Sequence, residues 1–316
     1  MVNKDQVTVV GAGMMGPGIA TSAALAGHSV VLVHRSPASA DRARNTIRRN
    51  LSQLLDGKLI DRNQVDRALE AVRIEPDLKC GLQGSFWIIE AINEDLSEKQ
   101  KLFKLIDQIA DPSVMLTSNT SGLCITDIVS KIKHPERTAT THFWFPGHLV
   151  PLVEIVMSQK TEETIAERLK TILHDWGKAP VIVRKDVPGQ LANRILQAVI
   201  REATYIVESG LASAEDVDTA IKMGFGIRMP AWGPLEHIDA VGLDLAISVQ
   251  RSVLPTLFNE SGPTNRLEDL VKNGHLGYKT GSGFYDWKKK DMNSLSQTRD
   301  QFVMQALRFF KKADQQ

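Results

Sequence analysis

The chain has 316 residues, of which 42% are apolar and 24% are charged, so its composition is that of a folded globular protein of about two domains. Lys and Arg total 38 and Asp and Glu total 37, and the resulting formal net charge of +1 provides no strong field for a nucleic acid or an anionic membrane. We expect a cytoplasmic protein without nucleic-acid, membrane or metal partners, because two cysteines cannot form a disulfide framework, no apolar run reaches the roughly 20 residues of a membrane span, and residues 1–6 carry no secretory pattern.

The first elements follow a strand, helix, strand order. A β-branched run at residues 6–10 ends at Gly11, an Ala- and Gly-rich segment follows over 13–27, and a second β-branched run occupies 29–33. Such continuous apolar runs are typical of strands buried on both faces of a parallel sheet. Residues 39–71 then predict a charged helical hairpin.

The remaining elements continue this alternation and then change character. Strands are predicted over 85–91, 114–117, 138–145, 152–156 and 179–184, with a helix over 97–109. After Val187 the pattern is helical, with helices predicted over 190–209, 214–223 and 234–254 and a terminal helix carrying Phe302, Met304, Leu307, Phe309 and Phe310. The order predicts an α/β fold with an N-terminal Rossmann-type doubly wound sheet (1–186), an all-α domain (187–290) and a C-terminal helical tail (291–316).

A glycine-rich turn follows the first strand. Gly11, Gly13 and Gly16 form a G-x-G-x-x-G motif whose intervening positions are Met14, Met15 and an alanine. In this context the first glycine permits the tight turn, the second lets the backbone approach a pyrophosphate, and the third lets the helix lie close to the sheet. The motif predicts a dinucleotide site at the N-terminus of the helix, where free N–H groups favour phosphate.

The end of the second strand departs from the dinucleotide fingerprint. The pattern expects Asp or Glu there to bind the ribose hydroxyls of NAD, but the chain has His34 followed by Arg35. Arg35 is able to bind a 2′-phosphate, which favours NADP, and the alternative is that it stacks on the adenine or points to solvent. We expect NAD as the cofactor, with NADP accepted because of Arg35.

A histidine and a carboxylate lie on consecutive strands. His142 ends one predicted strand and Glu154 lies in the next, across a Pro-Gly turn, so adjacent strands bring the two side chains together. A carboxylate on one ring nitrogen fixes the tautomer of a histidine and stabilises the imidazolium, as a general acid–base requires. From spacing alone, a structural histidine and a surface glutamate remain the alternative.

The motifs resemble the 3-hydroxyacyl-CoA dehydrogenase family, including its lambda-crystallin and L-gulonate dehydrogenase relatives, over nearly all of residues 5–287. The matching segments are VGAGMMG (10–16), EAINEDL (90–96), SNTS (118–121), HF (142–143), PLVEI (151–155), KDVPG (185–189), ANR (192–194) and GYKTGSGFY (277–285). The resemblance implies reversible oxidation of the secondary alcohol of a 3-hydroxyacyl compound, which would be a short-chain acyl-CoA of fatty acid metabolism. It also implies a homodimer that forms through the C-terminal domain.

The resemblance also assigns roles to residues of this chain. It implies that His142 is the catalytic acid–base, that Glu154 is its carboxylate partner, and that Ser121 and Asn193 hold the substrate oxygen. The cofactor contacts that it implies, beyond the glycine loop and residues 34–35, come from Glu94, Lys99 and Asn119.

The chain departs from the family pattern in three places. Phe145 stands where the family has an Asn after the catalytic histidine, and Gly122 replaces a Ser. The acyl-CoA enzymes use a Lys of the helical hairpin to contact CoA, whereas residues 55–58 here read Leu-Asp-Gly-Lys, with the lysine displaced. A non-CoA hydroxy acid or aromatic alcohol is therefore an alternative substrate class, and a catalytically silent, crystallin-like dinucleotide-binding protein is an alternative function.

Overall fold

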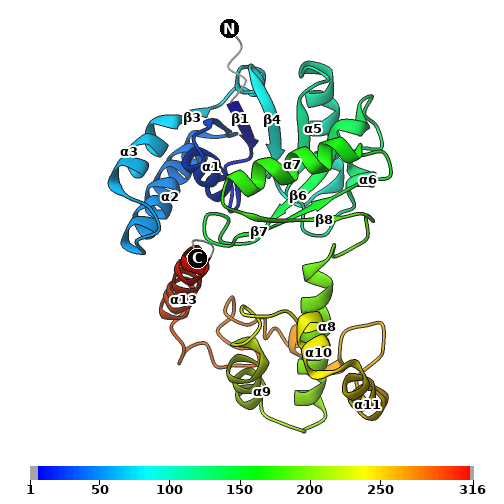
Figure 1. Cartoon of the computed structure of the whole chain (residues 1–316). Helices are drawn as coiled ribbons and strands as arrows, with labels where there is room; N and C mark the ends of the chain where they lie inside the picture. Colours follow the sequence, from blue (N-terminus) through cyan, green and yellow to red (C-terminus); the bar gives the residue numbers. More distant parts are fainter. Residues whose placement is uncertain (1–5, 314–316) are drawn as a thin grey trace. The chain divides into compact units, whose positions relative to one another are not determined.

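The computed structural model describes residues 6–313, which form two units (Figure 1). The first unit comprises residues 6–192 together with 300–313, and the second comprises residues 193–299. Residues 1–5 and 314–316, to which the predicted N-terminal domain and C-terminal tail extend, lie outside the described residues. Within 6–313, no helix is long and apolar enough to cross a membrane.

The first unit is built on one sheet with the strand order β3-β2-β1-β4-β5-β6-β7-β8. The strands are β1 (Gln6–Val10), β2 (Ser29–Val33), β3 (Val72–Glu75), β4 (Ser85–Glu90), β5 (Met115–Ser118), β6 (Thr138–Phe143), β7 (Leu152–Val156) and β8 (Ala179–Val183). All neighbours are parallel except β6 and β7, which pair antiparallel. The order reverses between β1 and β4, and in such sheets ligands bind outside the carboxyl ends of the strands at the reversal.

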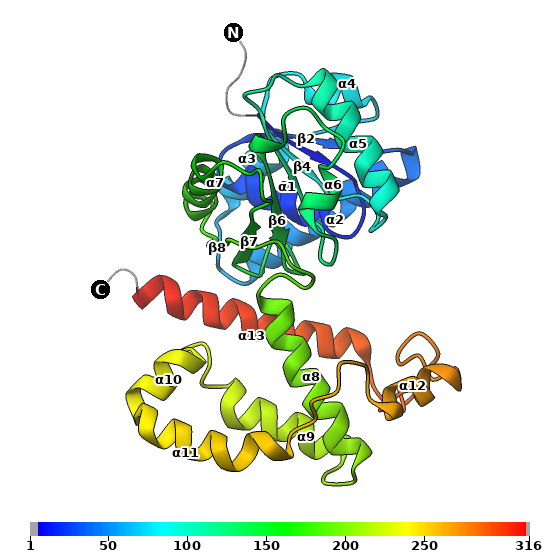
Figure 2. The ribbon, with the colours of Figure 1, turned by 90° about the vertical axis from the view of Figure 1, so that its right-hand side faces the viewer.

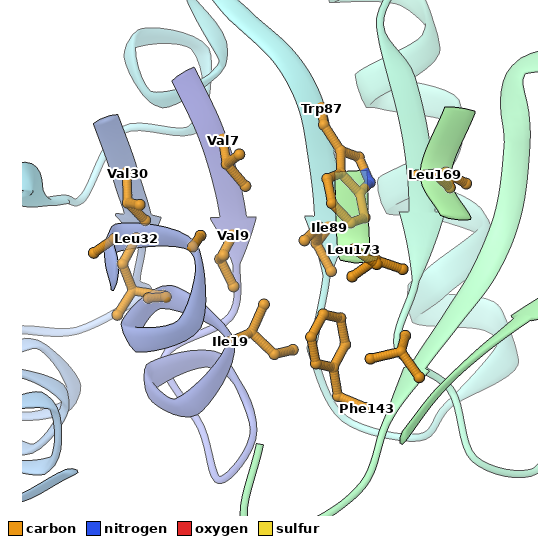
Figure 3. Packing of buried hydrophobic residues seen from close by; sticks show 14 of the residues in the cluster. Val7, Val9, Ile19, Val30, Leu32, Trp87, Ile89, Phe143, Leu169 and Leu173 are labelled. Atoms are coloured by element: carbon orange, nitrogen blue, oxygen red, sulfur yellow. The ribbon is translucent and has the colours of Figure 1, made fainter. Parts of the chain in front are cut away.

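Helices cover both faces of this sheet, as the predicted doubly wound fold requires. They are α1 (Gly16–Leu25), α2 (Pro37–Asp56), α3 (Arg62–Ala71), α4 (Leu78–Leu82), α5 (Leu96–Ile109), α6 (Ile125–Ile128) and α7 (Glu163–Asp175), with a short 3-10 helix η1 (Pro135–Arg137). One face packs on α1, α2, α3 and α7, where Ile19, Phe143 and Leu173 meet alternate residues of the central strands (Figure 3). The other face packs on α4, α5 and α6, so the central strands β1, β2, β4 and β5 are buried on both sides, which explains their continuous apolar runs.

Five elements of the first unit were absent from the sequence prediction, namely β3, α4, α6, η1 and α7. Strand β3 is a short edge strand, Val-Arg-Ile-Glu, which is too polar for a buried run. Helix α7 carries Ala166, Leu169 and Leu173 at helical spacing, and all three are fully buried. The buried apolar residues of α7 therefore have the spacing of an amphipathic helix, but the many charged residues between them made the helix hard to recognise from the sequence.

The second unit consists of helices, in agreement with the predicted all-α domain (Figure 2). They are α8 (Ala192–Glu208), α9 (Ala214–Ala220), the π-helical segment η2 (Ile221–Gly226), α10 (Pro234–Val241), α11 (Leu243–Val253), the 3-10 turn η3 (Leu254–Thr256) and α12 (Asn265–Lys272). The helix predicted over 234–254 is divided at Gly242, whose φ of +103° is a conformation that side chains with a Cβ rarely adopt. The matching motif at 277–285 forms a compact loop with isolated bridges at Ser282.

The last helix, α13 (Met292–Ala313), confirms the predicted terminal helix. Its Met304 is buried against Leu54 of α2 and Leu149, whereas Phe302 and Phe309 are exposed. The carboxylate of Asp300 accepts a hydrogen bond from the Gln53 amide at 2.8 Å. The second half of α13 is thus fixed to the helical hairpin of the first unit.

Candidate active site

Two glycines of the G-x-G-x-x-G motif are required by packing. A Cβ on Gly11, whose φ is +124°, would lie 2.4 Å from the Ala91 carbonyl oxygen. A Cβ on Gly16 would lie 1.8 Å from the Gly11 carbonyl oxygen. These positions hold the turn and the start of α1 against the ends of β1 and β4, as the motif predicts.

Gly13 differs, because a Cβ placed there would meet nothing within 4 Å. It lines a cleft of about 430 Å³ between the glycine loop, the end of β2 and the end of β4. The N-terminus of α1 has no side-chain cap at Met15, so its N–H groups are left for a ligand. The open face at Gly13 and the uncapped helix fit the pyrophosphate of a dinucleotide.

The predicted cofactor residues occupy this cleft to different extents. Gly11, Gly13, His34 and Arg35 line it. Met14 is 75% exposed beside the loop, and cofactor contacts from it and from Met15 stay predictions.

The antiparallel pairing of β6 and β7 places His142 directly opposite Glu154. Directly paired residues have side chains within contact distance. The His142 Nδ1 and Glu154 Oε2 atoms are 2.7 Å apart, and both side chains are buried. His142 Nε2 lies 3.1 Å from the Ser121 hydroxyl oxygen. The structure thus brings together three of the four predicted catalytic residues, and the ring nitrogen that faces Ser121 is the one not occupied by the carboxylate.

The Glu154 carboxylate accepts hydrogen bonds on both oxygens. Oε2 receives the Trp144 indole N–H at 2.9 Å as well as His142. Oε1 receives the backbone N–H groups of Leu191 at 3.0 Å and Ala192 at 2.8 Å. Burial alone would raise the pKa of this carboxyl, but the hydrogen bonds, led by that from His142, lower its pKa to about 2. Glu154 is therefore an anion at neutral pH.

A second carboxylate organises the loop that carries Ser121. Glu94 Oε1 accepts the Thr120 hydroxyl at 2.5 Å and the backbone N–H groups of Ser121 at 3.0 Å and Gly122 at 2.9 Å. Burial would raise the pKa of Glu94, but these donors and Lys99 lower it. Glu94 thus holds Ser121 toward His142, while its side chain as a whole is 44% exposed.

Lys99 and Asn119 are both buried. The Lys99 ammonium lies 2.6 Å from Glu90 Oε1 and 3.4 Å from Glu94 Oε2. The Asn119 carboxamide oxygen accepts the backbone N–H of Phe143, which joins the ends of β5 and β6. In this arrangement the Lys99 ammonium contacts two carboxylates and the Asn119 side-chain oxygen is occupied, so direct cofactor contacts of both residues stay predictions.

Asn193 is the second residue of α8 and belongs to the unit of residues 193–299. Its role in holding the substrate oxygen stays a prediction. The sequence did not mark two further residues of the site: Trp144, whose indole donates to Glu154, and Gln190, whose amide donates to the Thr120 carbonyl at 2.8 Å. No signal in the sequence marks either contact.

The site can be compared with known proteins. The model of the 3-hydroxyacyl-CoA dehydrogenase NAD-binding domain matches residues 6–187, and that of the family's C-terminal domain matches residues 189–287. The hydroxyacyl-coenzyme A dehydrogenase of Sus scrofa mitochondria is 36% identical over 296 residues, covering 89% of this chain and 91% of the relative. The 5-formyl-3-hydroxy-2-methylpyridine 4-carboxylate 5-dehydrogenase of Mesorhizobium japonicum is 30% identical over 293 residues, covering 93% and 94%.

Solved structures give the same result. A crystal structure of a 5-formyl-3-hydroxy-2-methylpyridine 4-carboxylic acid 5-dehydrogenase, described as an NAD+-dependent dismutase, matches with a TM-score of 0.90 and 29% identity over 98% of this chain and 99% of the other. The (S)-3-hydroxybutyryl-CoA dehydrogenase of Ralstonia eutropha matches with a TM-score of 0.75 and 33% identity over 90% and 100%. The chain therefore belongs to the 3-hydroxyacyl-CoA dehydrogenase family of NAD-dependent oxidoreductases.

Proposed function

We propose that the chain interconverts the secondary alcohol of a 3-hydroxyacyl compound and its 3-keto form, with NAD as the redox partner. The observation that carries this proposal is the line of Glu154, His142 and Ser121, with contacts of 2.7 Å and 3.1 Å. The family's chemistry requires such a general acid–base next to a nicotinamide site.

Some residues of the site transfer the proton, and others orient the substrate. Glu154 accepts the Nδ1 proton of His142, which leaves the Nε2 lone pair to take the proton of the substrate hydroxyl. The imidazolium that forms is stabilised by the adjacent carboxylate. Ser121, held by Glu94, orients the substrate oxygen before the step. NAD, when bound along the Gly11–Gly16 loop, supplies the acceptor for the hydride from the alcohol carbon.

For the substrate, the first candidate is a short-chain 3-hydroxyacyl-CoA. The family relatives support it, because the Sus scrofa and Ralstonia eutropha proteins are both described as acting on CoA esters. Such an activity would place the chain in fatty acid metabolism.

Two observations favour a second candidate, a hydroxy carboxylate or aromatic alcohol without CoA. The helical hairpin, at which acyl-CoA enzymes contact CoA, is partly covered here, because Met304 packs on Leu54 and Asp300 binds Gln53. The pyridine carboxylate dehydrogenase structure also matches almost the whole chain, with the TM-score of 0.90. A covered hairpin leaves less surface for the adenosine phosphates of CoA.

One assay separates these substrates. The oxidation of NADH is followed with acetoacetyl-CoA, with the matching methyl ester and with a set of free keto acids and aromatic aldehydes. A kcat/KM at least about tenfold higher for the CoA ester than for the methyl ester supports the first candidate, because it measures binding of the CoA moiety. Equal values support the second, and no turnover with any compound supports the silent, crystallin-like alternative.

We also propose that the chain is a cytoplasmic homodimer that assembles through the second unit. Helices α10 and α11 bury none of their residues, and Leu235, Leu243 and Leu245 are exposed. Apolar surface of this extent is typical of an interface with a second copy. Light scattering after size exclusion tests it: we expect a dimer mass for the wild type and a monomer mass for Leu243→Glu, and a monomeric wild type would refute the assembly.

The cytoplasmic location fits two free thiols, Cys80 and Cys124, and fractionation of cells tests it.

A further inference from the structure

The cleft that begins at the glycine loop ends in a group of basic side chains beyond β2. Arg35 and Arg42 line the cleft together with His34, Ser36 and Ser39. Within residues 6–313, neither guanidinium has a hydrogen bond or an ion pair with another side chain. Arg35 also lines a shallower hollow beside the cleft, where Arg44 is its neighbour. Arg35 and Arg42 therefore border the end of the cleft beyond β2.

Two carboxylates in the neighbourhood, Asp41 and Glu75, each already have a cationic partner, although Asp41 lines the same hollow as Arg35 and Arg44. Asp41 pairs with Arg44 at 2.9 Å. Glu75, at the end of β3, pairs with Arg73 and accepts the backbone N–H of Asp77. No described carboxylate lines the 430 Å³ cleft. A carboxylate at the end of β2 would favour a free ribose 2′-hydroxyl and repel a 2′-phosphate, and this carboxylate is missing because His34 occupies the position.

Several other polar groups of the cleft are satisfied by local contacts. Ser36 and Ser39 cap the start of α2 reciprocally, and the Ser39 hydroxyl donates to the Ser36 carbonyl at 2.7 Å. His34 Nδ1 lies 2.8 Å from the same carbonyl oxygen. The guanidinium groups of Arg35 and Arg42 and the Asn93 amide line this cleft without a side-chain hydrogen bond among the described residues, and of these the guanidiniums carry the charge and the planar geometry that match a phosphate.

We propose that this end of the cleft is a binding site for the 2′-phosphate of NADP(H), held by Arg35 and Arg42, so that the chain accepts NADP(H) in addition to NAD. The proposal rests on the dinucleotide site of the proposed function. It concerns only the adenosine end of the cofactor and is independent of the substrate, so it is tested by binding rather than by turnover.

The first experiment compares ligands that differ only in the phosphate. The Kd values of NADPH and NADH are measured by coenzyme fluorescence, and 2′,5′-ADP and 5′-AMP are measured as competitors. We expect 2′,5′-ADP to bind at least about fivefold more tightly than 5′-AMP, with an advantage that falls as salt rises. Equal or weaker binding of 2′,5′-ADP overturns the proposal. NADH binding with no phosphate advantage leaves the proposed function intact, whereas binding of neither coenzyme contradicts both.

Single variants then assign the effect to residues. Arg35→Ala and Arg42→Ala should each weaken NADPH at least about tenfold and NADH less than about threefold, since one arginine–phosphate contact of this type is lost. Arg48→Ala is the matched control, because it removes the same charge from the same helix outside the cleft, and it should change neither Kd. His34→Asp, which restores the carboxylate, should reverse the preference toward NADH. Equal changes in both coenzymes for the Arg35 and Arg42 variants would refute the assignment.

Discussion

Trp144 offers a sharp test of how the acid–base pair is tuned. Its indole N–H lies 2.9 Å from the same Glu154 oxygen that binds His142, and its ring lies 5.5 Å from the imidazole. The N–H withdraws electron density from that oxygen and thereby weakens its stabilisation of the imidazolium. Trp144→Phe removes the donor and keeps an aromatic ring, so it should make imidazolium formation more favourable.

The size of the effect follows from the hydrogen bond. A hydrogen bond to a charged acceptor contributes about 1.5–3 kcal/mol. We take the strength of the Trp144–Glu154 hydrogen bond to differ between the neutral and the charged His142 ring by roughly a third to a half of the lower value. This gives about 0.5–0.8 kcal/mol, or a shift of about 0.4–0.6 pH unit. Alcohol oxidation needs the neutral ring, so the midpoint at which kcat/KM rises with pH should move to higher pH by that amount in Trp144→Phe.

The assay is a pH profile of kcat/KM for oxidation at saturating NAD, with two controls. Trp176→Phe is the matched substitution, because the Trp176 N–H has no hydrogen-bond partner among the described residues and its loss should leave the midpoint unchanged. In a Glu154→Gln background the Trp144 substitution should produce no shift, since the effect passes through the carboxylate. An unchanged midpoint in Trp144→Phe, or a shift to lower pH, would refute the reasoning.

Four further predictions concern other parts of the first unit. His142→Ala should lower kcat by about 10²–10⁴-fold and leave the Kd of NADH nearly unchanged in a fluorescence titration; more than half of the wild-type rate would exclude the acid–base role. Gly13→Val should weaken NADH about tenfold or more without changing the thermal midpoint, because a Cβ there points into the open cleft. Gly16→Ala should instead destabilise the fold by about 1–3 kcal/mol, because a Cβ would meet the Gly11 carbonyl; denaturant unfolding of the two variants distinguishes the roles, and equal stability would contradict this division. Lys178 donates to the Gly147 carbonyl at 2.7 Å, and burial lowers its pKa to about 7. The unfolded chain therefore binds more protons between pH 7 and about 10.5, so the wild type should gain stability relative to Lys178→Met by about 1 kcal/mol per pH unit in that range, and a flat or falling difference would be evidence against the buried lysine.

The sequence by itself determined the fold of the first unit and the place of its cofactor site. The β-branched runs at 6–10 and 29–33 are largely buried, so their apolar character marks them as strands, and Gly11 and Gly16 between them are fixed by close backbone contacts that a Cβ would prevent. The same local logic failed at β3, which is an edge strand with charged residues, and at α7, whose buried positions are separated by charged ones.

The acid–base pair could be suspected from the sequence and was selected by the resemblance, but only the tertiary structure decided its environment. The antiparallel register of β6 and β7 determines which residue faces His142, and a register shift of one position would turn Glu154 to the other face of the sheet. The donors on Glu154 come from Trp144 and from the backbone at Leu191 and Ala192, which lie far apart along the chain. Neither residue type nor spacing encodes a backbone N–H directed at a carboxylate, because that contact exists only once the segment after β8 has folded against the end of the sheet.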